Sequence, residues 1–187
     1  MDLVTAARTT AERLLSQALP RRWTHVKAVS VKASEVSMIL DEVDRPFLVA
    51  AAWLHDIGYA PEIISSGLHA LDGARWLRQN GFDERVAALV AYHSCAHFEA
   101  EERGLADVLR AEFVDEETST RDALWYVDMT TGPDGQNFDV LERLAEVRSR
   151  YGPHHLVSRF WARAEPTLVA AVRRTEERLA AIDYQPM

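Results

Sequence analysis

Apolar residues recur along this chain every three or four positions, which is the spacing of one face of an α-helix. Strict alternation of apolar and polar residues, the mark of a half-buried strand, is not convincing anywhere, and no internal repeat is visible. The pattern therefore predicts an all-α protein. The expected helices cover about residues 3–18, 22–40, 45–56, 68–80, 84–93, 105–113, 119–128, 139–150 and 154–182.

Capping residues, glycine and proline mark where several of these helices should begin and end. Asp44 and Pro46 supply an N-cap and a first-turn proline, and Asp83 caps a later helix. Gly81 takes the position just past a helix C-terminus. Pro166 is expected to kink or divide the last helical segment.

The 187 residues are enough for one sizeable core, and no linker rich in proline, glycine or serine divides them. We therefore expect a single domain over residues 1–187. Its chemically distinctive core spans about 22–135, and further helices follow over about 139–182. The charged run at 99–103 is expected to be a solvated surface.

The formal charge of −8 at pH 7 argues against non-specific binding to nucleic acid, although a locally positive pocket could still hold a phosphate. Cys95 is the only cysteine, which excludes an intrachain disulfide and fits a reducing compartment. We expect Cys95 to be a small buried residue rather than a nucleophile. Nothing resembles a signal peptide or a membrane span, so we expect a cytoplasmic protein with no membrane partner.

One apolar helix ends in an adjacent imidazole and carboxylate. The run Ala50–Leu54 leads directly into His55 and Asp56. Burying an unpaired carboxylate costs several kcal/mol, so the pair needs a compensating partner. A divalent metal satisfies both groups at once. The alternative is a helix-terminal His55 that interacts with the helix dipole while Asp56 caps the next turn.

Other apolar helices deliver ionisable groups in the same way. One run leads into His93, another into Asp128, and His25 and His69 lie in the first turns of their helices. Any one of these histidines is best interpreted as an ordinary core or surface residue. An ordered set from five helices instead favours one shared site in the bundle core. The set is His25, His55, Asp56, His69, His93 and Asp128.

This order resembles the HD-domain superfamily of metal-dependent phosphohydrolases, in which a His is followed by a His-Asp pair and a distal Asp. The matching residues are His25, His55, Asp56 and Asp128, and residues 54–58 are the most specific piece. The resemblance implies a compact single-domain helical bundle. It also implies that these four residues bind a divalent metal.

Members of the family that hold two metals carry two further histidines between the pair and the distal Asp. His69 and His93 match those positions in order. The resemblance thus implies two ions per chain bridged by Asp56, with iron or manganese favoured and zinc, magnesium, cobalt or nickel also compatible. A single ion, with His69 and His93 as substrate contacts, remains the alternative.

Many family members carry a lysine directly after the glycine of the His-Asp motif, where it helps to bind an anionic substrate. This chain has Tyr59 there, which could donate a hydrogen bond instead. Arg22 precedes His25 by three residues and can share its helical face, so it is the best substitute cation. The alternative for Arg22 is a surface salt bridge.

The resemblance implies that this protein is a metal-dependent phosphohydrolase. Asp56 and His55 would take part in catalysis by holding metal-activated water, and the partner would be a small anionic, phosphorylated substrate such as a phosphate ester or nucleotide. Two alternatives remain open. One is a di-iron oxygenase of the same superfamily, and the other is a metal-bound sensor without catalytic activity.

Overall fold

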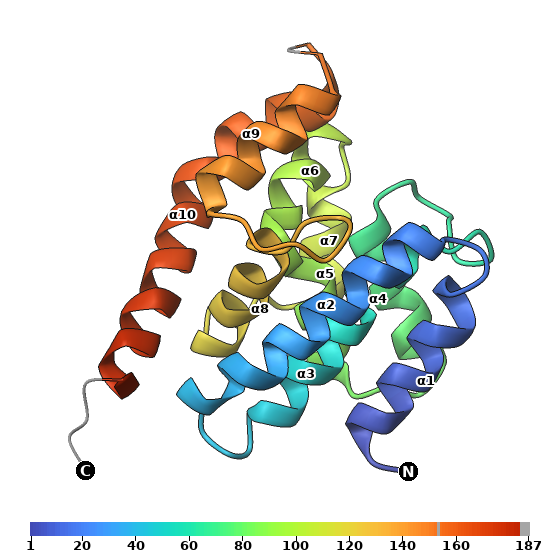
Figure 1. The fold of residues 1–187 in the computed structure, drawn as a ribbon. Helices are drawn as coiled ribbons and strands as arrows, with labels where there is room; N and C mark the ends of the chain where they lie inside the picture. Colours follow the sequence, from blue (N-terminus) through green and yellow to red (C-terminus); the bar gives the residue numbers. More distant parts are fainter. Residues whose placement is uncertain (153, 184–187) are drawn as a thin grey trace.

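Helices joined by short loops make up this chain, as the periodicity predicts, in a computed structural model that describes residues 1–152 and 154–183. The predicted domain also includes Pro153 and residues 184–187, which lie outside the described residues. Short 3-10 helices are η1 (Ser37–Ile39), η2 (Ile57–Tyr59) and η3 (His93–Cys95). The α-helices in Figure 1 are α1 (Leu3–Leu15), α2 (Pro20–Val36), α3 (Arg45–Leu54), α4 (His69–Gln79), α5 (Glu84–Tyr92), α6 (Ala96–Glu102), α7 (Ala106–Glu112), α8 (Ser119–Met129), α9 (Val140–Arg150) and α10 (Leu156–Asp183).

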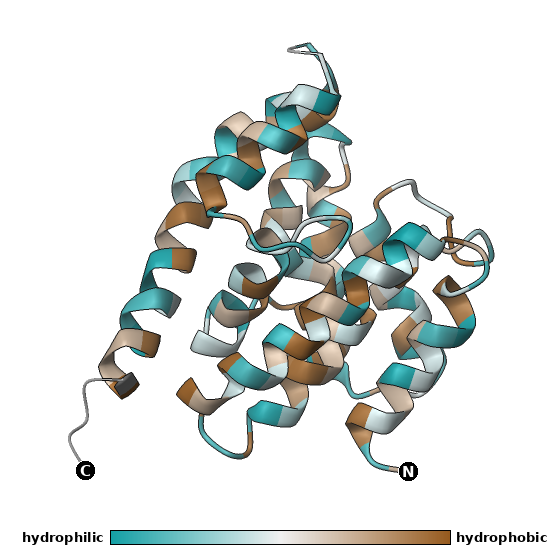
Figure 2. Ribbon diagram, viewed as in Figure 1, coloured by the Kyte–Doolittle hydropathy of each residue, from teal (hydrophilic) through white to brown (hydrophobic). Residues whose placement is uncertain are grey.

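Helix α3 is the central element of the bundle, because α1, α2, α5 and α8 all pack against it. Its alanines at 50–52 are fully buried, as are Leu48 and Leu54. Small side chains let neighbouring helix backbones come close, and burial of the larger ones stabilises the contact. The outer helices α1, α2 and α10 carry both hydrophilic and hydrophobic residues, as expected of helices with one face in the core (Figure 2).

Helices α9 and α10 form a hairpin at the edge of the bundle, and α10 packs along α8 and α6 (Figure 1). The buried carboxylate of Asp122 on α8 accepts hydrogen bonds of 2.7 and 2.9 Å from the Arg174 guanidinium on α10. This bidentate pair fixes α10 against the core. Helix α10 continues through Pro166, so the segment is not divided there.

One local prediction is wrong, and another holds only in part. Asp44 precedes α3, but its side chain makes no capping hydrogen bond and pairs with Arg85 on α5 at 2.5 Å. The charged run at 99–103 is solvated only in part, because Glu101 and Arg103 are exposed but Glu99 is not. Glu99 lies on α6, is only 7% exposed, and accepts from Arg103 at 2.6 Å. For Asp44, a tertiary ion pair replaced the capping role that the local sequence indicated, whereas Glu99 pairs with the residue one helical turn further along.

Gly58 lets η2 and α4 approach more closely than any other residue would allow. A Cβ atom built on Gly58 would lie 1.9 Å from the His69 carbonyl oxygen and 2.8 Å from the Gly73 nitrogen. Both obstacles are backbone atoms, so no side-chain rotation could relieve the overlap. The glycine after the His-Asp pair therefore sets the position of His69.

Gly58→Ala should lower the free energy of unfolding by about 1–3 kcal/mol or more, because the added methyl group overlaps the backbone of α4. Gly152→Ala is the control, since a Cβ there meets nothing within 4 Å. Urea denaturation of both variants measures the difference. Equal stability of Gly58→Ala and the wild type would contradict this account of the close approach.

Candidate metal centre

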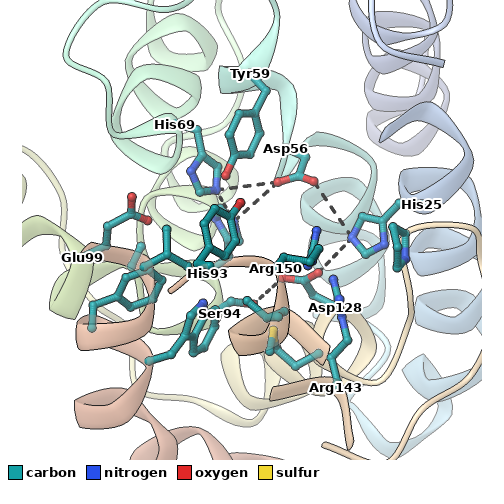
Figure 3. Close-up of a pocket in the computed structure, with 18 of the residues that line it drawn as sticks. His25, Asp56, Tyr59, His69, His93, Ser94, Glu99, Asp128, Arg143 and Arg150 are labelled. Atoms are coloured by element: carbon teal, nitrogen blue, oxygen red, sulfur yellow. Dashed lines mark hydrogen bonds and ion pairs between the residues drawn. The ribbon is translucent and has the colours of Figure 1, made fainter. Parts of the chain in front are cut away.

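The structure brings together all six residues that the sequence singles out at the centre of the bundle, and five of them line one pocket (Figure 3). The sixth, His55, is fully buried beside Asp56 and Asp128. The six residues lie at the ends of helices α3, α4, α5 and α8 and on one face of α2. Five of the six residues are buried, and the His69 side chain is 14% exposed. They are His25 from α2, His55 and Asp56 after α3, His69 from α4, His93 after α5 and Asp128 from α8.

Three of these residues form a first cluster. His25, His55 and Asp128 each offer a ligand atom within 4.8 Å of the others. The Asp128 Oδ1 atom lies 3.0 Å from His25 Nε2 and 3.6 Å from His55 Nε2. Two imidazoles and a carboxylate at these separations are a donor set that suits a divalent first-row metal.

The other three residues form a second cluster, with ligand atoms again within 4.8 Å of one another. His69 Nε2 lies 3.1 Å from His93 Nε2. Asp56 Oδ1 is 3.7 Å from His69 Nε2 and 4.0 Å from His93 Nε2. The second cluster thus has the same composition as the first.

Asp56 lies between the two clusters and presents a different oxygen to each. Its Oδ1 atom faces His69 and His93. Its Oδ2 atom is 3.5 Å from His55 Nε2 and 4.0 Å from His25 Nε2. A carboxylate placed in this way can serve two ions at once.

The proton positions on three of the histidines follow from their backbone contacts. In each ring Nδ1 lies within hydrogen-bond distance of a carbonyl oxygen, which can only accept, so Nδ1 carries the proton. The ring is thereby oriented with its Nε2 atom towards the cluster. The acceptors are Gly132 for His25 at 3.1 Å, Ala52 for His55 at 2.8 Å and Val90 for His93 at 2.6 Å.

The remaining polar atoms are consistent with a cation in this pocket. His55 Nε2 is fully buried and has no hydrogen-bond partner in the described part of the chain. The Nε2 atoms of His69 and His93 face each other at 3.1 Å. Two nitrogens bound at right angles to one ion, each about 2.1 Å away, would lie about 3 Å apart. The residues therefore fit a metal ion.

The electrostatics of the pocket keep four of these side chains in the forms that bind metal. Burial tends to raise the pKa of Asp56, but Arg22 and His55 outweigh it and hold the pKa well below its usual range. Burial also opposes ionisation of Asp128, yet His55 and His25 lower its pKa. For His69 and His93, burial and the neighbouring imidazoles lower the pKa. At neutral pH both carboxylates are ionised and both these imidazoles are neutral.

A family model, described as the HD domain, matches residues 22–124, which is more than half of the chain. This chain belongs to the HD-domain family. The matched residues include five of the six residues of the two clusters, and Asp128 lies just beyond them. HD-domain proteins are in general metal-dependent hydrolases. No curated protein and no solved structure matches this chain.

Arg22 and Tyr59, the expected substrate contacts, both lie at the edge of this HD-domain site. The Arg22 guanidinium donates to Asp56 Oδ2 and lies 3.6 Å from the centre of the Tyr59 ring. Tyr59 stacks on His69 with 4.0 Å between ring centres. Arg22 is therefore paired with a buried carboxylate of the site and not with a surface partner.

Ser94 belongs to the site, although sequence reasoning missed it. Its hydroxyl donates to Asp128 Oδ2. Ser94 and Cys95 have left-handed backbone conformations, with φ of 45° and 61°, which turn the chain sharply after His93. Such strained residues cluster at functional sites. Cys95 itself is buried as predicted, and burial raises the pKa of its thiol.

The HD-domain pocket extends beyond the six residues into a cavity of about 420 Å³. Helices α9 and α10 form one wall of it, with Arg143 and Trp161 among the lining residues. Sequence reasoning gave these residues no role, because they follow the last motif residue and carry no recognisable spacing. Among the described residues, no helix is both long and apolar enough to cross a membrane.

His55 should make the stability of the metal-free protein fall as pH rises. Burial lowers the pKa of His55, but Asp56 and Asp128 outweigh it and raise the pKa from 6.5 to about 9. The charged imidazole thus stabilises the fold below pH 6.5, and this contribution is lost as pH rises through about 9. A single such group gives a slope of about −1.4 kcal/mol per pH unit within that window.

Urea denaturation in a chelator between pH 6.5 and 8 measures this slope. A Cys95→Ala background removes the buried thiol, which would otherwise add to it at the alkaline end. His55→Gln in the same background should reduce the slope. A slope unchanged by His55→Gln would show that another group is responsible.

Proposed function

We propose that this protein is a metal-dependent phosphohydrolase that acts on a small phosphate ester or nucleotide. His25, His55 and Asp128 hold one divalent ion, and His69 and His93 hold a second. Asp56 contributes one oxygen to each. Iron or manganese is the favoured metal, because imidazole and carboxylate ligands suit both.

The observation that carries this proposal is the position of Asp56 between two clusters of equal composition. Each of its oxygens faces a different pair of imidazoles, at 3.5–4.0 Å. A purely structural ion pair would need one cation beside the carboxylate, whereas here imidazoles are gathered on both sides. Membership of a family of metal-dependent hydrolases supports the same conclusion.

Bound divalent ions would supply a water with a pKa lowered towards neutrality and would polarise a phosphoryl oxygen. The protein contributes orientation. Ser94 holds Asp128 by its hydroxyl, and three backbone carbonyls hold the imidazole rings. Burial raises the pKa of Tyr59, so its hydroxyl stays protonated and can donate to a substrate oxygen.

Arg22 supplies positive charge next to the reacting centre. Its guanidinium pairs with Asp56, and its side chain is 33% exposed, so it can also reach a ligand in the cavity. A guanidinium matches two phosphate oxygens at once. Arg22 and Tyr59 together therefore take the place of the lysine that many relatives have after the glycine.

Metal stoichiometry tests the two-ion arrangement. Protein reconstituted anaerobically with excess Mn²⁺ and desalted should contain two ions per chain by elemental analysis, because there are two complete clusters. His69→Gln combined with His93→Gln should leave one. His97→Gln, outside the pocket, is the control and should keep two. A wild-type plateau at one ion, unchanged in the double variant, would eliminate the second site.

Asp56→Asn should abolish hydrolysis of phosphate esters by the metal-loaded protein, with a loss well beyond the 10- to 100-fold typical of residues that only orient ligands. Asp83→Asn is the control, because asparagine preserves the helix cap that Asp83 provides. A screen of phosphomonoesters and nucleotides identifies the substrate. Substrate-dependent consumption of dioxygen by the ferrous protein, without phosphate release, would instead establish an oxygenase.

A further inference from the structure

One wall of the cavity comes from helices outside the part of the chain that the HD-domain model matches. Val147 and Arg143 project from α9, and Phe160 and Trp161 from α10, whereas the match ends at residue 124. Figure 1 shows this hairpin packed against the remainder of the bundle. This wall therefore lies outside the part of the chain that carries the family match.

Two arginines of the cavity lack a carboxylate of their own, and both lie on α9. Five arginines line the cavity, and three of them each have a carboxylate of their own. Arg143 and Arg150 instead share the single carboxylate of Glu146. These two arginines therefore have one paired carboxylate between them. The one-to-one pairs are Arg21 with Asp134, Arg22 with Asp56, and Arg103 with Glu99.

Arg143 has donor capacity that the protein does not use. Its side chain is only 10% exposed, and one of its terminal nitrogens donates to Glu146. Its Nε atom is buried and has no hydrogen-bond partner among residues 1–152 and 154–183. An unsatisfied buried donor costs about 1–3 kcal/mol, and more on a charged group. Figure 3 shows Arg143 among the residues that surround the same pocket as the two clusters.

The wall beside Arg143 is apolar and aromatic. Phe160 and Trp161 pack together with 4.7 Å between ring centres, and Val147 lies on the facing helix of the hairpin. All three side chains line the cavity. The volume of about 420 Å³ lies in the range of sites for small molecules, about 300–1,000 Å³. These apolar side chains lie beside the Arg143 guanidinium, which can bind an anion. The cavity therefore suits a ligand with one anionic end and one apolar end.

We propose that Arg143 binds the charged phosphate group of the substrate and that Val147, Phe160 and Trp161 bind its organic part. This inference rests on the proposed function and narrows its substrate class to small phosphate monoesters with an apolar or aromatic organic group. Arg143 is a substrate-binding residue here. The α9–α10 hairpin, and not the shared metal motif, then selects the substrate.

Binding of two phosphonates tests this proposal without turnover. Phenylphosphonate and methylphosphonate carry the same anionic group and differ only in the organic part. Calorimetry on the manganese-loaded protein should give a phenylphosphonate Kd at least tenfold lower than that of methylphosphonate. Val147→Thr should raise the Kd for phenylphosphonate and leave that for methylphosphonate unchanged, because a hydroxyl replaces a methyl group at similar volume.

Arg143→Met should raise the Kd of both ligands at least tenfold. Arg148→Met is the matched control, because Arg148 lies on the same helix, pairs with Glu165 and does not line the cavity. Arg143→Lys keeps the charge but loses the two-pronged geometry, so it should bind several-fold more weakly than the wild type. Circular dichroism establishes whether each variant is folded. If Arg143→Met does not fold, Arg143→Lys alone tests the role of Arg143.

The outcomes separate this inference from the proposed hydrolysis. Wild-type affinity in both Arg143 variants, or no binding of either phosphonate to the wild type, would overturn the role of Arg143. Equal affinity for the two phosphonates would overturn the apolar subsite. Binding that depends on Arg143, in a protein that releases phosphate from no ester, would retain the anion site while rejecting the hydrolase.

Discussion

The rest of the structure depends on keeping four imidazoles and two carboxylates in the interior of a helical bundle. The fold meets this requirement at helix ends, where backbone carbonyls lack intrahelical partners. His55 and His93 use the same device, since each follows an apolar helix and donates from Nδ1 to the carbonyl three residues earlier. The apolar helices α3 and α5 therefore end in the same way, and each end directs the Nε2 atom of its histidine towards the site.

Unusual backbone positions bring these helix ends to one point. Gly58 allows η2 to lie against the His69 carbonyl, and no residue with a Cβ atom would fit. Ser94 and Cys95 adopt left-handed conformations directly after His93, which places the Ser94 hydroxyl on Asp128. Close approach and strain both occur at the site and hold its side chains in place.

The α9–α10 hairpin is fixed by contacts that lie away from the pocket. Two hydrogen bonds from Arg174 to the buried carboxylate of Asp122 hold α10 against α8. These anchors leave Arg143 free to face the cavity with part of its donor capacity unused. The molecule thus combines the HD-domain motif with a cavity wall that lies beyond the matched residues.

The sequence by itself determined the all-α class, most helix ends and the six residues of the two clusters. These are local properties, because an apolar run that ends in an ionisable residue is visible without knowing its partners. The Asp83 cap and the left-handed Gly81, with φ of 77°, were predictable for the same reason. Only the tertiary structure decided that Asp56 lies between two clusters, that Arg22 pairs with it and that Asp44 pairs with Arg85. The last two contacts join residues 34 and 41 positions apart, and helix packing rather than local pattern sets which side chains meet over such separations.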